Sequence, residues 1–255
     1  MKAVFQMSNL GPLSFYPGIE VHQDNSGITL RQTAYAKSVV ELGGLTDYNP
    51  ALTPMEERLK LSCDSTTEEV DATQYRHLVG SLHYLAHMRP DLAFFVGYAV
   101  KRILRYVAGT LDYGLHYPRC LEAAHFIGYS DSDHAGDIDT SKSTSGMLFF
   151  LGKCLLARLL GDLLGKDVEA VELRVDIKSA LTLAKNPVFH ERSKHIRVKY
   201  HFIRGCLEEG SVKANYINTK DQLADLLTKS LRMIKFQELC SGIGMVQLPL
   251  KTRKT

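Results

Sequence analysis

Apolar and polar residues alternate over residues 19–22 and again over residues 28–31, with turn-forming Asp-Asn-Ser-Gly at 24–27 between them. A period of two is typical of a strand with one buried face, so this segment predicts a β-hairpin. We expect a helix over residues 32–42, because a pair of glycines follows it. Residues 45–70 carry two prolines and many polar residues, which indicates a surface connection.

Helical periodicity dominates the next segment. Asp71 has the position of an N-cap, and apolar residues recur behind it on one helical face as far as Arg89 and Pro90. A second helix is expected over residues 90–108, with proline in its first turn and Gly109 after its end.

From residue 126 the pattern changes to strands that end near acidic residues. Strands are predicted over residues 126–130, 147–151, 171–175 and 212–217, and an acidic loop occupies residues 131–137. Helices are expected over residues 155–164, 179–185 and 193–209, and from residue 221 onward.

The composition, 45% hydrophobic and 23% charged over 255 residues, is that of a globular protein with one large or two small domains. A net charge of +3 excludes a protein that coats nucleic acid non-specifically, so any nucleic-acid site must be a local patch. Five widely spaced cysteines without a Cys-x-x-Cys pair predict neither a zinc site nor a disulfide framework. No export signal or membrane-spanning stretch is found, so we expect an intracellular protein, cytoplasmic or nuclear, with no membrane partner.

Three aspartates have positions from which they could hold a metal ion. Asp131 and Asp176 each follow a predicted strand, and Asp221 opens the predicted last helix. The strands of a parallel or mixed sheet gather such side chains at one edge, and Mg²⁺ prefers several carboxylate oxygens from separate elements. Asp is also common at strand ends and helix N-caps for structural reasons, so spacing alone leaves both interpretations open.

Several ordered blocks of sequence carry a more specific signal, and they resemble the ribonuclease H domain of copia-type LTR retroelements. The blocks are Gly-Tyr-Ser-Asp-Ser-Asp-His-Ala-Gly-Asp at 128–137, Lys-Ser-Thr-Ser-Gly at 142–146, Ala-Lys-Asn-Pro-Val-Phe-His at 184–190, Ser-Lys-His-Ile at 193–196, Tyr-His-Phe-Ile-Arg at 200–204 and Asp-Gln-Leu-Ala-Asp-Leu-Leu-Thr-Lys at 221–229.

The first half is similar to the end of the reverse transcriptase that precedes this domain in the same Pol polyproteins. The similarity includes Leu-Gly-Pro-Leu at 10–13, Tyr-Arg-His-Leu-Val-Gly-Ser-Leu at 75–82 and Leu-Arg-Tyr-Val-Ala-Gly-Thr-Leu at 104–111. The resemblance therefore covers nearly the whole chain.

The resemblance implies an α/β fold in three parts. Residues 1–120 would be a mostly helical reverse-transcriptase remnant with one β-hairpin, residues 121–240 a ribonuclease H-like mixed sheet with helices, and residues 241–255 a basic tail. Asp131, Asp176 and Asp221 would be the catalytic residues and the ligands of Mg²⁺. Their reaction would be cleavage of the RNA strand of an RNA–DNA hybrid.

Two departures from the family predict that catalysis is impaired. The family places a further strand, and a helix that carries a catalytic glutamate, ahead of the strand ending in Asp176. Only nineteen residues separate residues 151 and 171 here, too few for a strand and two helices, and neither Glu169 nor Glu172 has a matching motif. The paired aspartates of the polymerase Tyr-x-Asp-Asp turn are not in the sequence, and a second compression falls between Val100 and Lys101. We expect a domain that lacks one strand and one helix, with no polymerase site.

Basic residues are concentrated between residues 192 and 204, which indicates weak binding of an RNA–DNA hybrid or another nucleic acid, or else a solvated helix face. His134 could be a metal ligand or a surface residue. Two alternatives stay open: an active Mg²⁺-dependent ribonuclease H whose glutamate comes from elsewhere, and a non-catalytic module recruited by the host, with nucleic acid or a protein as its partner. The candidate nucleic-acid contacts are Arg192, Lys194, Arg197, Lys199 and Arg204.

Overall fold

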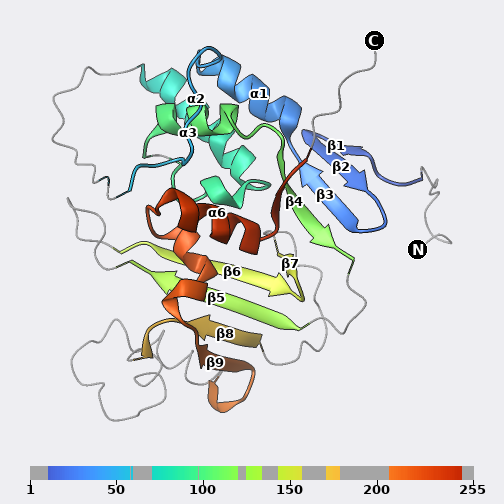
Figure 1. Cartoon of the computed structure of the whole chain (residues 1–255), viewed down its shortest axis with the longest axis vertical. Coiled ribbons are helices and arrows are strands. Elements are labelled where there is room, and N and C mark those ends of the chain that lie inside the picture. The colour runs from blue at the N-terminus through green and yellow to red at the C-terminus, as the bar shows by residue number, and fades with distance from the viewer. Residues whose placement is uncertain are drawn as a thin grey trace.

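The computed structural model describes residues 11–57, 59, 71–96, 98–119, 125–133, 143–156, 171–178 and 207–248. Over these residues the chain forms two five-stranded sheets and four α-helices, which confirms the predicted α/β class (Figure 1). No helix in these ranges is long and apolar enough to cross a membrane.

The first sheet is antiparallel and has the strand order β1-β2-β3-β4-β10. The predicted hairpin is confirmed as β2 and β3, and the Asp24 carboxylate closes its turn by accepting hydrogen bonds from the Ser26 and Gly27 backbone N–H groups. A Cβ at Gly27 would collide with the backbone carbonyl of Tyr117, so the close approach of β4 requires glycine there. The strands are β1 (Phe15–Tyr16), β2 (Ile19–Gln23), β3 (Gly27–Arg31), β4 (Tyr113–Pro118) and β10 (Met245–Gln247).

This sheet corrects the prediction that a single hairpin is the β structure of the first part. The hairpin is the middle of a larger sheet, because β4 pairs with β3 and β10 pairs with β4 from the far end of the sequence. β10 also lies within residues 241–255, the predicted basic tail, so part of that tail is an ordered strand; residues 249–255 lie outside the described residues.

Helix α1 (Thr33–Leu42) contacts β2 of the first sheet and packs against α2 (Ala72–Ala86) and α3 (Val100–Ala108). Asp71 caps α2 by accepting a hydrogen bond from the Thr73 backbone N–H, as predicted. The helix expected over residues 90–108 is wrong in extent, because only η1 (Pro90–Leu92) and α3 are helical among the described residues of this segment.

A buried cluster of polar side chains explains the break between η1 and α3. Arg89 Nη2 lies 2.8 Å from Asp91 Oδ2, and the Tyr106 hydroxyl donates to the same oxygen at 2.8 Å. Arg89 Nη1 also donates to the Thr110 carbonyl at 2.9 Å. A turn at Asp91 places its carboxylate between these donors, and a buried charge pair needs such complete partnering to be tolerated.

The second sheet is mixed and has the strand order β7-β6-β5-β8-β9. β6 pairs antiparallel with β5 and β7, whereas β5, β8 and β9 run parallel to one another. The strands are β5 (Phe126–Ser132), β6 (Ser145–Leu151), β7 (Cys154–Leu155), β8 (Val171–Val175) and β9 (Val212–Tyr216).

The expected loss of a whole strand after β6 is corrected by β7. Leu155 pairs with Phe150 and Cys154 with Leu151, so the chain returns antiparallel along β6 after a tight turn at Gly152 and Lys153. Leu155, predicted to begin a helix, is therefore a buried strand residue. The rest of the helix predicted at 155–164, the helix predicted at 179–185 and residues 193–206 of the helix predicted at 193–209 lie outside the described residues.

The helix expected from residue 221 is replaced by two short 3₁₀ helices, η3 (Thr219–Asp221) and η4 (Leu223–Leu227). The fully buried Gln222 separates them, because its side-chain amide donates to the Ser130 carbonyl of β5 at 3.0 Å and its oxygen accepts from the Ala224 backbone N–H. A regular helix follows only at α6 (Met233–Gly242).

Helix α6 joins the two sheets into one hydrophobic core. Figure 1 shows α6 between the helices of the first part and the second sheet. The ring of Phe236 contacts Phe95 and Tyr106, with centroid distances of 6.2 and 5.7 Å. The same core includes Leu148 and Phe150 of β6. Described residues of the predicted parts at 1–120 and 121–240 therefore share one hydrophobic core.

Candidate metal centre

The parallel pairing of β5 and β8 brings two of the expected aspartates together. Ser130 of β5 pairs with Val175 of β8. The residues that follow them, Asp131 and Asp176, therefore lie side by side at the carboxyl ends of neighbouring parallel strands. One oxygen each of Asp131, Asp176 and Asp225 lie within 4.8 Å of one another. Opposite oxygens around a Mg²⁺ ion are about 4.2 Å apart, twice the usual metal–oxygen distance. The spacing of the three carboxylates therefore suits one divalent cation.

The third carboxylate is Asp225, whereas the sequence interpretation expected Asp221. Asp221 is exposed in η3, and Asp225, four residues later in η4, has only 4% of its surface exposed. The replacement follows from Gln222, which ends η3 and turns η4 onto β5 and β6. A signal for Asp225 was present in the sequence, since it lies between apolar Ala224 and Leu226 in the same block, and both are buried.

Gly146 lets η4 approach the sheet closely. It pairs with Asp131 across β5 and β6, and a Cβ there would lie 2.5 Å from the Cβ of Leu227. Because real side chains do not come this close, only glycine leaves room for η4 at this point. Gly146 thus helps to bring Asp225 beside Asp131.

Two residues after η4 hold the carboxylates in place. The Thr228 hydroxyl donates a short hydrogen bond to Asp131 Oδ2. Lys229 Nζ lies 2.6 Å from Asp225 Oδ1 and 3.2 Å from Asp131 Oδ2. Neither Thr228 nor Lys229 was singled out from the sequence.

The charges of this group shift two pKa values. Burial raises the pKa of Asp225 and the charges of Asp131 and Asp176 add to this effect, although the hydrogen bond from Lys229 opposes it. Burial alone would lower the pKa of Lys229, but its hydrogen bond to Asp225 and the charges of Asp225 and Asp131 outweigh burial and raise it. At neutral pH Lys229 is therefore a firmly charged ammonium.

Asp176 provides an independent indication of a cation. Its Oδ1 is buried and has no hydrogen-bond partner among the residues that the structure describes. An unpartnered carboxylate oxygen away from water is costly, and a bound cation would compensate that cost. The carboxylates of Asp131, Asp176 and Asp225 thus fit a hard divalent ion such as Mg²⁺.

No fourth Asp, Glu, His or Cys joins the group within the ranges that the structure describes. Glu172 is engaged elsewhere, since its Oε1 accepts hydrogen bonds from Arg174 at 3.0 Å and from Asn215 at 3.2 Å. Glu169 and His134 lie outside the described residues, as do the five candidate nucleic-acid contacts Arg192, Lys194, Arg197, Lys199 and Arg204.

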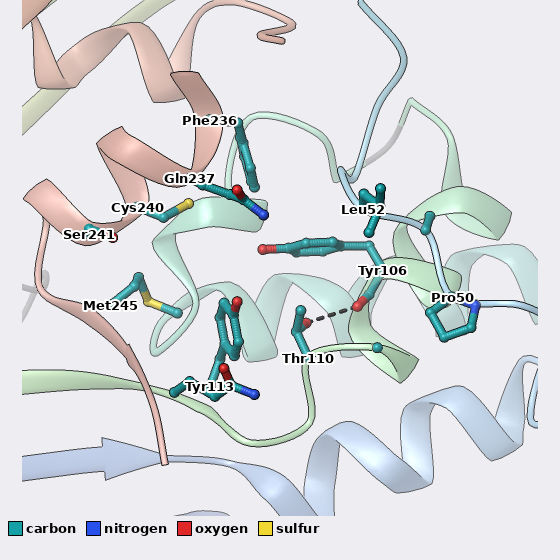
Figure 2. Close-up of a pocket in the computed structure, with 13 residues that line it drawn as sticks. Pro50, Leu52, Tyr106, Thr110, Tyr113, Phe236, Gln237, Cys240, Ser241 and Met245 are labelled. Carbon is teal, nitrogen blue, oxygen red and sulfur yellow. Dashed lines mark hydrogen bonds between the residues drawn. The ribbon is translucent and has the colours of Figure 1, made fainter. Parts of the chain in front are cut away.

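A separate cavity of about 460 Å³ lies between α3, β4 and α6. Figure 2 shows Cys240 and Gln237 of α6 across it from Tyr106, with Tyr113 and Met245 beside them. Among the described residues, no Asp, Glu, Lys, Arg or His lines it, and burial raises the pKa of the Cys240 thiol, which stays protonated at neutral pH.

Comparison with known proteins places the chain among transposon proteins. It is 32% identical over 96% of its length to the retrovirus-related Pol polyprotein from transposon RE2 of Arabidopsis thaliana. It is 33% identical over 94% of its length to the corresponding protein from transposon TNT 1-94 of Nicotiana tabacum. It is also 34% identical to an uncharacterized mitochondrial protein of Arabidopsis thaliana, over 60% of this chain and 68% of that protein.

The family described as reverse transcriptase (RNA-dependent DNA polymerase) matches residues 1–57. The chain spans about a fifth of the length of the curated Pol relatives that it matches. The match to the RE2 protein extends over 294 positions although the chain has 255 residues, so that relative has residues without a counterpart here. No solved structure matches the chain.

Proposed function

Since the chain belongs to the Pol polyproteins of copia-type retrotransposons, we propose that its second sheet is a ribonuclease H-type module that retains a metal site but cleaves RNA–DNA hybrids poorly or not at all. The observation that carries this proposal is the group formed by Asp131, Asp176 and Asp225 at the ends of two neighbouring parallel strands.

The order of the strands supports the ribonuclease H assignment. The family pattern requires two strands, a third strand, the strand that ends in the second aspartate, and a further strand before the last acidic residue. β5, β6, β7, β8 and β9 follow in this order along the chain and form one mixed sheet. Asp131 and Asp176 take the positions that the first and third of the family's acidic residues would have.

Each described residue of the site has a defined task in this proposal. Asp131 and Asp225 are oriented by Thr228 and Lys229, and Asp176 presents an oxygen that accepts no hydrogen bond from the described part of the chain. Bound Mg²⁺ would supply charge that activates water and stabilises the leaving oxygen. The RNA–DNA hybrid would be the ligand, and the basic residues between 192 and 204 would contact its phosphates.

The shortened connection before β8 is the reason for impaired catalysis. The longer RE2 alignment supports the loss of internal segments, and we place one loss between β7 and β8, where the family carries its catalytic glutamate. Removal of one acidic residue from a two-metal site costs several kcal/mol of transition-state stabilisation, which corresponds to roughly a thousandfold or more in rate.

A cleavage assay with a labelled RNA–DNA hybrid tests this function. We expect no Mg²⁺-dependent cutting above about one thousandth of the rate of an active ribonuclease H. We also expect the wild-type chain to bind Mn²⁺ and the Asp225→Asn variant to lose this binding. The Asp221→Asn variant, changed at an exposed position, should still bind Mn²⁺. Rapid Mg²⁺-dependent cleavage that Asp131→Asn abolishes would show that the module is active.

A further inference from the structure

The ammonium group of Lys229 forms ion pairs with two of the three carboxylates of the site. We infer that Lys229 is a built-in counter-ion that takes the role of a second divalent cation, so that the site binds one ion instead of two. This inference rests on the proposed metal site and concerns how many ions that site accepts and how tightly.

Lys229 contacts two of the three carboxylates. Its Nζ bridges Asp225 Oδ1 at 2.6 Å and Asp131 Oδ2 at 3.2 Å. Lys229 stands four residues after Asp225 and directly after Thr228, which itself donates to Asp131. The ammonium is thus fixed by the same segment that positions the carboxylates, while the buried Oδ1 of Asp176 stays without a donor. The oxygen that remains available to a metal ion is therefore Asp176 Oδ1.

The charge balance agrees with this division. Three ionised carboxylates and one ammonium sum to a net charge of −2, which a single divalent cation neutralises. Two divalent cations would leave an excess of positive charge among side chains that are largely withdrawn from water, which is unfavourable. A fourth carboxylate would reduce that excess, but the described residues do not supply one.

Removal of the ammonium should therefore strengthen ion binding. We expect wild-type chain to bind one Mn²⁺, measured by electron paramagnetic resonance. Lys229→Met should bind Mn²⁺ about tenfold more tightly, or take up a second ion, because a competing cation has gone. Lys229→Arg, which keeps the charge, should behave like wild type. Lys37→Met is the matched control, since it makes the same change in net charge on α1 of the first part.

Thermal unfolding gives a second readout that does not depend on activity. Without divalent ions, Lys229→Met should unfold at a lower temperature than wild type, because three neighbouring carboxylates then repel one another. Mn²⁺ should restore the unfolding temperature of Lys229→Met, and this increase should be larger than the increase that Mn²⁺ causes in wild type. Lys229→Gln repeats the test with a polar replacement if the methionine variant does not fold.

The outcomes separate this inference from the proposed metal site. If wild type binds Mn²⁺ and Asp176→Asn abolishes binding, but a folded Lys229→Met binds no better than wild type, the inference about Lys229 is wrong and the metal site stands. If neither wild type nor Lys229→Met binds Mn²⁺, both are wrong.

Discussion

At the scale of single residues, the buried Asp225 combines a favourable contact with an unfavourable position. Its carboxylate is hydrogen-bonded to Lys229, yet it is withdrawn from water beside Asp131 and Asp176. The net effect is a raised pKa, with burial as the largest cause. Without a bound ion, the ionised form of Asp225 is therefore less stable in the folded protein than in the unfolded chain.

This raised pKa predicts a pH-dependent effect of Asp225→Asn in the presence of a chelator. Below the pKa of an unfolded Asp, near 3.8, the carboxyl is protonated in both states and the substitution should change the free energy of unfolding little. As the pH rises above that value, the folded wild type pays an increasing cost to ionise Asp225, so the variant becomes the more stable protein. Chemical denaturation at pH 4 and pH 7 measures the difference.

Asp221→Asn is the control for this prediction, because Asp221 is exposed and lies four residues earlier in the chain. We expect it to change the free energy of unfolding by less than about 0.5 kcal/mol at either pH. A destabilisation of Asp225→Asn that grows between pH 4 and pH 7 would mean that the contact with Lys229 outweighs the burial of the carboxylate.

At the scale of elements, the site depends on how closely η4 lies on β5 and β6. Gly146 is a point where η4 approaches the sheet closely, and the positions of Asp131, Thr228 and Asp225 depend on the same approach. The side chain of Gln222 holds the other end of η4 to β5. Metal binding and the packing of η4 should therefore be linked.

Gly146→Ala tests this link. The added methyl group must displace Leu227 and Thr228, so we expect a loss of about 1–3 kcal/mol in the free energy of unfolding, together with weaker Mn²⁺ binding. Gly80→Ala in α2 is the control, because a Cβ there meets nothing within 4 Å and alanine favours a helix. It should be neutral or stabilising with Mn²⁺ binding unchanged. If both substitutions changed the free energy of unfolding and Mn²⁺ binding equally, the packing of η4 would not be the cause of these changes.

Elements whose cause is local could be predicted from the sequence. The β2–β3 hairpin follows from the alternation and from a turn closed by Asp24, and the start of α2 follows from Asp71. Asp131 and Asp176 were recognisable because each directly follows a strand that the sequence predicts.

The features that sequence reasoning missed depend on contacts between distant residues. Asp225 replaces Asp221 because Gln222 bonds to Ser130, 92 positions away. The break before α3 follows from the bond between Tyr106 and Asp91, and β7 is a strand only because β6 pairs with it. Strand β10 is three residues long and has no pattern of its own that distinguishes it from a tail.

At the scale of the whole molecule, the C-terminal segment ties the two sheets together. η4 packs on the second sheet, the ring of Phe236 in α6 contacts the ring of Tyr106 in α3, and β10 pairs with β4 in the first sheet. The buried apolar residues of the two parts form one cluster, so neither part has a separate hydrophobic core among the described residues. We therefore expect the first sheet with its helices and the second sheet to unfold in a single cooperative transition.

Phe236→Ala tests this cooperation, because Phe236 is 1% exposed and contacts Phe95 and Tyr106. Loss of a fully buried phenyl ring should lower the free energy of unfolding by about 3–5 kcal/mol. Ile234→Ala, on the same helix but 68% exposed, should cost less than about 1 kcal/mol. Urea unfolding followed by NMR signals from the first sheet and from the second sheet should show both lost at the same, lower urea concentration. If the second sheet persisted after the first had unfolded, α6 would not couple the two parts.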